Sequence, residues 1–77
     1  MKEELNNKSV FINRLSDLLR TDPRSDIYIL LYEAITFDGC TDENIHVCYT
    51  DGHFADIIVT GKSIGAIAKA VINEVYK

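Results

Sequence analysis

Two cysteines and two histidines are the residues in this chain whose types suit metal binding: Cys40, His46, Cys48 and His53. Their spacing, C-x5-H-x-C-x4-H, matches none of the usual zinc patterns, which bring ligands in close pairs such as C-x2-C. His46 and Cys48 share one face of a predicted strand, so a fortuitous site is geometrically allowed. We expect instead an outward-facing histidine and a half-buried thiol, with no metal and no other cofactor.

A second arrangement, with Cys48 as nucleophile, His46 as base and Asp56 as its partner, would suit covalent catalysis. Such a set needs the thiolate within hydrogen-bond reach of the imidazole in a partly dry pocket. Residues two apart along a strand lie roughly 6–7 Å apart on a flat face, and no glycine-rich elbow adjoins them. We therefore expect a polar pair between strands and no enzyme. Paired carboxylates are also missing, because Asp42 and Glu43 are adjacent in a predicted loop and are expected to be solvated.

The run Gly61-Lys62-Ser63 resembles the end of a phosphate-binding loop. That loop needs a glycine five positions before Gly61, where this chain has Asp56. We interpret the run as a strand-to-helix corner in which Ser63 caps the helix. Lys62 and Ser63 could still make a weak anion contact, as at any helix N-terminus.

Two amphipathic helices are predicted to flank these residues. The clearer one spans Ile64 to Tyr76, where apolar residues recur at helical spacing. They are Ile64, Ile67, Ala68, Val71, Ile72 and Val75. The other spans Lys8 to Arg20 with Asn6 or Ser9 as cap, while residues 1–7 are frayed or form its ragged start. Its predicted apolar face consists of Phe11, Ile12, Leu15, Leu18 and Leu19.

The segment between the helices favours three strands. Residues 27–37 are rich in β-branched and aromatic side chains, which favours a strand, although their spacing also fits a helix. Residues 38–43 are predicted to form a turn or short loop, and the other strands span Asn44–Tyr49 and Ala55–Thr60. A loop of three residues, Thr50-Asp51-Gly52, with Gly52 left-handed, keeps charge out of the core.

That loop also fixes which residues face each other. It sets Ile45 opposite Ile57 and Val47 opposite Ala55 on the core face, and His46 opposite Asp56 on the other. The chain is thus predicted to be a single α+β domain over residues 1–77, of order α-β-β-β-α. Both helices would pack on one face of a three-stranded antiparallel sheet.

The other sheet face is the expected functional surface. It presents His46, Cys48, Phe54, Asp56 and Ile58, together with one face of residues 27–37. On that strand either Tyr28, Leu30 and Tyr32 or Ile29 and Leu31 must point outward. This is more apolar surface than a small monomer usually exposes. We expect a protein interface, most simply a symmetric dimer formed sheet to sheet or edge to edge.

Composition limits the partners. The chain has 77 residues, 47% of them hydrophobic, which fits one folded domain with a small core. A net charge of −4 makes nucleic acid a poor partner. No apolar run approaches the ~20 residues of a membrane span, and the polar N-terminus is not a signal peptide. We expect a cytoplasmic protein with reduced cysteines.

Two resemblances can be stated. The order α-β-β-β-α, with Gly61-Lys62-Ser63 before an alanine-containing helix, resembles the double-stranded-RNA-binding domain, which implies phosphate contacts through Lys62, Lys69, Arg14 or Arg20. The lysine cluster of that family is replaced here by Ile64-Gly65-Ala66. The second half, from Tyr49 to Ala68, resembles small proteins carried by phages and mobile elements of Gram-positive bacteria. It implies an accessory or regulatory role and no particular activity.

Overall fold

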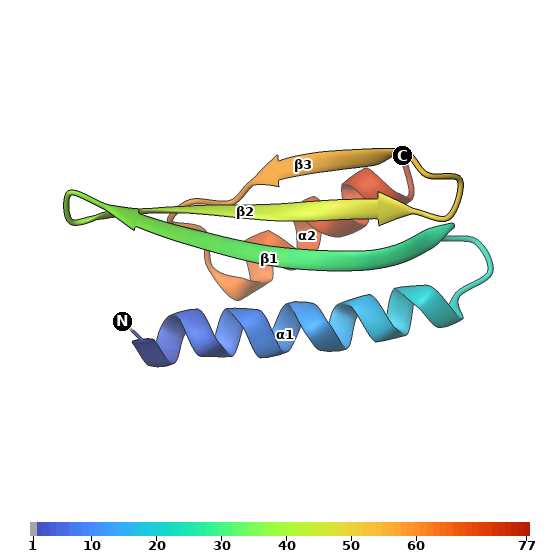
Figure 1. The fold of residues 1–77 in the computed structure, drawn as a ribbon. Coiled ribbons are helices and arrows are strands. Elements are labelled where there is room, and N and C mark those ends of the chain that lie inside the picture. The colour runs from blue at the N-terminus through green and yellow to red at the C-terminus, as the bar shows by residue number, and fades with distance from the viewer. Residues whose placement is uncertain (1) are drawn as a thin grey trace.

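A computed structural model describes residues 2–77, and their side chains from residue 7 onward. Its elements are α1 (Lys2–Thr21), β1 (Ile27–Phe37), β2 (Cys40–Tyr49), β3 (Phe54–Ile58) and α2 (Ile64–Val75). The strands form one antiparallel sheet in the order β1-β2-β3 (Figure 1). The predicted α+β architecture and the strand interpretation of residues 27–37 are confirmed.

One hydrophobic core joins both helices to one face of the sheet. Figure 1 shows α1 running alongside β1, with α2 behind the strands. The buried side chains come from α1, β1, β2 and α2 and from Val59, the residue after β3. They are Ile12, Leu19, Ile27, Leu30, Ile45, Val47, Val59, Ile67 and Val71. We call the sheet face that supplies this core the inner face and the opposite one the outer face.

The β2–β3 hairpin has the predicted loop. Tyr49 N–H donates to the His53 carbonyl at 3.0 Å, which closes a loop of three residues, and Gly52 has φ +95°. His46 pairs with Asp56, Ile45 with Ile57 and Val47 with Ala55, so the predicted register is confirmed. The physical reason holds: a shift of one residue would have turned Asp56 into the core.

The β1–β2 connection was predicted wrongly. Residues 40–43, expected in a loop, belong to β2, and Phe37 pairs with Cys40 across a two-residue turn. Asp38 and Gly39 both have positive φ, 51° and 77°, which is the type I′ geometry favoured in tight hairpins. The pairing of β3 ends at Ile58 opposite Asn44, so the hairpin projects beyond β3 as an arm.

Helix α1 differs from the prediction in three ways. It begins at Lys2 rather than Lys8, so neither Asn6 nor Ser9 is its cap. Leu18, expected on the apolar face, is 67% exposed, whereas Lys8 is buried. Of residues 1–7, which we expected to be frayed or ragged, Met1 lies outside the described residues.

The predicted cap of α2 is confirmed, because Ala66 N–H donates to Ser63 Oγ at 3.2 Å. In the preceding strand β3, the last residue is Ile58, two residues earlier than predicted. Val59 then bonds back to Glu43, its N–H donating to the Glu43 carbonyl at 2.9 Å. The corner between β3 and α2 therefore starts at Val59, whose buried side chain and backbone hydrogen bond hold it in place.

Glu43 is buried and not solvated as predicted. Its Oε1 accepts from Lys8 Nζ at 2.8 Å and from the Tyr32 hydroxyl at 2.6 Å, and its Oε2 accepts from Gly61 N–H at 3.0 Å. Burial raises the pKa of Glu43, but these hydrogen bonds outweigh burial and hold the pKa below the ordinary value. This carboxylate therefore ties together α1, β1, β2 and the corner before α2.

Candidate interaction surface

The outer face is bare, because both helices contribute to the core on the inner side. Register and alternation place thirteen side chains on the outer face. They are Ile29, Leu31, Glu33, Ile35 and Phe37 from β1, Cys40, Asp42, Asn44, His46 and Cys48 from β2, and Phe54, Asp56 and Ile58 from β3. Of the two sets that we considered for β1, the structure selects Ile29 and Leu31, since Leu30 is buried.

Most of the apolar side chains on this face are exposed. Phe37 is 75% exposed, Ile58 69%, Ile35 66% and Phe54 61%. Cys48 is half-buried between Ile29 and Phe54 in the pairing. All five residues predicted for an interface, His46, Cys48, Phe54, Asp56 and Ile58, lie on this face. Ile35 and Phe37 continue the alternation of Ile29 and Leu31 but were not named in the prediction, because their partners in residues 40–43 were expected in a loop.

A hydrogen-bonded polar group lies at the centre of the outer face. His46 Nδ1 is 2.6 Å from Asp56 Oδ1, which also accepts from Asn44 Nδ2 at 3.1 Å. The hydrogen bonds from His46 and then Asn44 hold the pKa of Asp56 below its ordinary value. The Phe54 ring lies 4.8 Å from the imidazole. His46 and Asp56 therefore form the polar pair that the register predicted.

Charge on the outer face is of one sign. Glu33, Asp42 and Asp56 supply carboxylates, and none of the thirteen residues is lysine or arginine. Lys62 and Ser63 lie exposed at the corner before α2, where Ser63 Oγ is already used by the cap. The outer face consequently lacks the cations that grip phosphate backbones.

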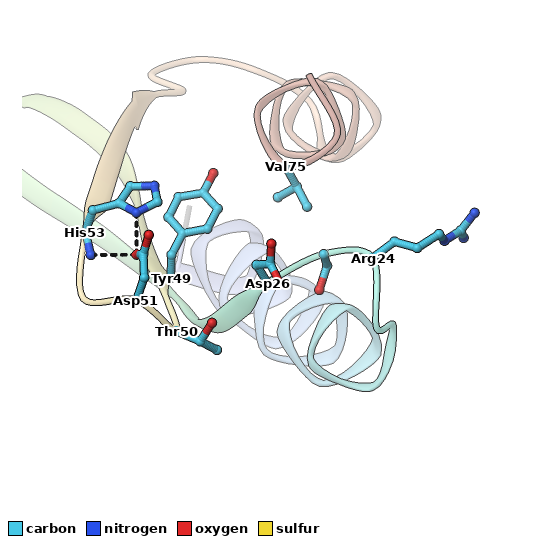
Figure 2. Close-up of a pocket in the computed structure, with 8 residues that line it drawn as sticks. Arg24, Asp26, Tyr49, Thr50, Asp51, His53 and Val75 are labelled. Atoms are coloured by element: carbon cyan, nitrogen blue, oxygen red, sulfur yellow. Dashed lines mark hydrogen bonds and ion pairs between the residues drawn. The ribbon is translucent and has the colours of Figure 1, made fainter.

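A separate half-open hollow of about 330 Å³ lies where the chain turns between α1 and β1, beside the β2–β3 loop and the end of α2 (Figure 2). His53 stacks on Tyr49 at 4.2 Å between ring centres and bonds to Asp51. Burial raises the pKa of Tyr49, and a 3.0 Å hydrogen bond to Glu74 raises it further, to about 12.

This hollow offers little chemistry. Figure 2 shows Arg24 directed away from it. Among its hydroxyl groups, the buried Ser25 Oγ is already occupied, because it bonds to the carbonyls of Leu19 and Asp22. Neither His46 nor Cys48 lines the hollow, so the structure does not bring the candidate catalytic residues into a cavity. Nothing in the sequence pattern had indicated this hollow, which combines three segments distant along the chain.

Two further results concern the described residues. No group of three or more histidine, cysteine or acidic side chains among them is arranged to hold a metal ion. None of the helices they form combines the length and apolarity needed to cross a bilayer.

Comparisons of the chain with protein-family models, curated proteins and solved structures find no match. The likeness to phage and mobile-element proteins and to the RNA-binding domain therefore stays a prediction.

Proposed function

We propose that this protein is a non-catalytic interaction module of the cytoplasm that associates with itself through its outer face, in an accessory or regulatory role. The observation that carries the proposal is an apolar sheet face which no element of the described chain covers. Two unpaired thiols, Cys40 and Cys48, support a reducing compartment.

The size of the apolar surface supports a stable contact. At the exposures given above, the outer-face Phe, Leu and Ile side chains amount to roughly 600 Å² of apolar area. The largest patch on a typical monomer is about 300–600 Å², and a standard interface buries about 800 Å² per partner. With the half-buried polar residues of β2 included, the outer face reaches the area of a specific interface.

Association through the sheet edges is less favourable than association through the face. At the β1 edge, Leu30 N–H already donates to Ser16 Oγ of α1 at 3.0 Å. At the β3 edge, full antiparallel pairing with a second β3 would set Asp56 directly opposite Asp56. Like charges directly opposite each other destabilise a strand pair. Short length and a central charge are common protections of an edge strand.

The hydrogen-bonded polar side chains at the centre of the outer face add little to the free-energy cost of burying that face. His46 Nδ1 and Asn44 Nδ2 already bond to Asp56 Oδ1, and His46 is half-buried beside Phe54, although Asn44 Oδ1 has no donor among the described residues. Buried polar groups are costly mainly when they lose partners. A partner that covers this face would therefore leave few of these polar atoms without a hydrogen bond.

Sedimentation equilibrium over a range from micromolar to several hundred micromolar protein tests the proposal. We expect a reversible monomer–dimer equilibrium. Phe54→Ser and Ile35→Ser, at opposite ends of the outer face, should each weaken dimerisation at least tenfold. Leu18→Ser is the matched control, because Leu18 is equally exposed but lies on α1. A wild-type protein that stays monomeric throughout would contradict self-association.

A further inference from the structure

The outer face has a pattern that restricts how two copies can pack, an inference that rests on the proposed self-association. The middle strand β2 presents three polar side chains on the outer face, Asp42, Asn44 and His46, and a cysteine at each end. The flanking strands are mainly apolar. In the aligned class of sheet packing, strands of the two sheets lie within about 30° of each other, so a second copy packed in this way has its strands either in the same or in the opposite direction.

The same-direction arrangement matches poorly. A two-fold axis along the strands sets each β2 residue over its own counterpart, so Asp42 meets Asp42. It also sets β1 of one copy over β3 of the other. From the register, Leu31 then meets Asp56, and Glu33 meets Ile58. Burying a carboxylate against an aliphatic side chain is costly.

The opposite-direction arrangement matches well. With the two-fold axis across the strands at Asn44, Asp42 of each copy meets His46 of the other, carboxylate against imidazole. Strand β1 now lies over β1, so Ile35 meets Leu31 and Phe37 meets Ile29. On β1 and β2, the outer-face residues up to two positions either side of Asn44 are all covered, whereas Phe54 and Asp56 lie beyond the end of the partner's β3. An axis placed elsewhere along β2 leaves one apolar end of β1 bare.

The residues in register with Asn44 lie at the two-fold axis, where each meets its own counterpart. Asn44 makes a favourable contact there and Glu33 an unfavourable one. Asn44 Oδ1 is a buried acceptor for which the described residues supply no hydrogen-bond donor. A second Asn44 brings an amide donor to the axis. Glu33 meets Glu33, but it lies at the β1 side of the face, where its side chain can turn toward water.

We propose that two copies pack outer face to outer face, with β2 over β2 in opposite directions and the two-fold axis at Asn44. Two features select this arrangement: Asp42 does not meet its own counterpart, and the apolar side chains of β1 from Ile29 to Phe37 cover one another. A consequence is that Cys40 of one copy lies over Cys48 of the other, at both ends of the interface.

Thiol cross-linking tests the direction. Face-to-face sheets lie ~10 Å apart, too far for a disulfide but within reach of a flexible bis-maleimide. We expect covalent dimers for the wild type, none for Cys40→Ser or Cys48→Ser alone, and covalent dimers again when the two variants are mixed. If each single variant cross-links by itself, or a dimeric wild type does not cross-link, the proposed direction is wrong.

Charge variants give an independent readout by sedimentation. In the same-direction arrangement, where Asp42 meets Asp42, Asp42→Asn should strengthen dimerisation about two- to fivefold, whereas the proposed arrangement predicts no strengthening. Glu33→Gln should strengthen dimerisation by a similar factor. Strengthening by Asp42→Asn would overturn the arrangement while leaving self-association intact. A monomeric wild type would instead overturn the proposed function itself.

Discussion

Glu43 shows how one buried charge can hold a small fold together. Three donors from three separate segments converge on its carboxylate, from Lys8, Tyr32 and Gly61. A second connection runs through Thr60, whose Oγ accepts from Glu43 N–H at 3.1 Å. Because a buried carboxylate is tolerated only when it is paired and hydrogen-bonded, the position of each segment depends on the others.

Lys8→Met tests this dependence. The variant removes the cation from Glu43 and should lower the free energy of unfolding by about 3 kcal/mol at pH 7. The hydrogen bond from Lys8 lowers the pKa of Glu43 below its ordinary 4.5, so the stabilisation is present above that pH and is lost as the pH falls through the folded value. The deficit should therefore shrink at pH 3.5.

Urea unfolding of both proteins at pH 7 and pH 3.5 measures these differences. Lys69→Met, an exposed position on α2, is the control and should change stability by at most about 0.5 kcal/mol. A deficit of equal size at both pH values would mean that Glu43 does not depend on the charge of Lys8.

At the scale of elements, two glycines differ in whether their backbone conformation requires glycine. Gly39 has φ +77°, and a Cβ added there would meet no atom within 4 Å. Gly39→Ala should therefore cost about 1 kcal/mol, the penalty of a left-handed L-residue. Gly65, in the first turn of α2, is equally unobstructed but has no positive φ, so Gly65→Ala should stabilise by about 0.5 kcal/mol. Thermal or urea unfolding that gave both changes the same sign would contradict this explanation.

The attachment of α1 to the sheet edge is a second testable feature of the elements. Ser16→Ala leaves the buried Leu30 N–H without the acceptor that it now has at 3.0 Å. An orphaned buried donor costs about 1–3 kcal/mol. Ser9→Ala in the same helix removes no hydrogen bond shown among the described residues, so urea unfolding should show little loss. Equal losses in the two variants would argue against a special role for Ser16.

The elements also show what the sequence can and cannot predict. The β2–β3 register followed from one argument, that Asp56 must not face the core. Residues 40–43 escaped prediction because their sequence, Cys-Thr-Asp-Glu, has no alternation of apolar and polar residues to mark a strand. Glu43 was misjudged for a different reason: its partner Lys8 lies 35 positions away, and no local pattern reveals such a pair.

At the scale of the whole molecule, a single layer of helices covers one face of the sheet, and the described residues leave the outer face uncovered. The chain measures 39 × 20 × 16 Å along its principal axes, and its core lies between the helices and the inner face of the sheet. The candidate surface could be predicted in outline because a strand with apolar residues on both faces must expose one of them. Its extent could not, since the arm with Ile35 and Phe37 depends on residues 40–43, which were expected in the loop and belong to β2.

The dependence of stability on pH is a property of the entire set of ionisable groups. Hydrogen bonds lower the pKa values of several carboxyls below their ordinary range: Glu43, Asp51, Asp56 and Glu74. Their stabilisation is present above pH ~4.5 and is lost as the pH falls through the lowered values. We therefore expect acid unfolding to begin below about pH 4.5, with Glu43 contributing most because it alone of the four is buried.

The alkaline limit has a different origin and its own test. Burial and the bond to Glu74 raise the pKa of Tyr49 to about 12, so between pH 10 and 12 the unfolded chain loses this proton more readily than the folded one. Stability should fall across that interval. Tyr49→Phe removes the titrating group, and it should cost about 1 kcal/mol at pH 7 through the lost hydrogen bond while making the alkaline decline shallower. Urea unfolding at pH 7, 9 and 11 measures both effects, and an unchanged alkaline slope in the variant would assign the decline to other groups.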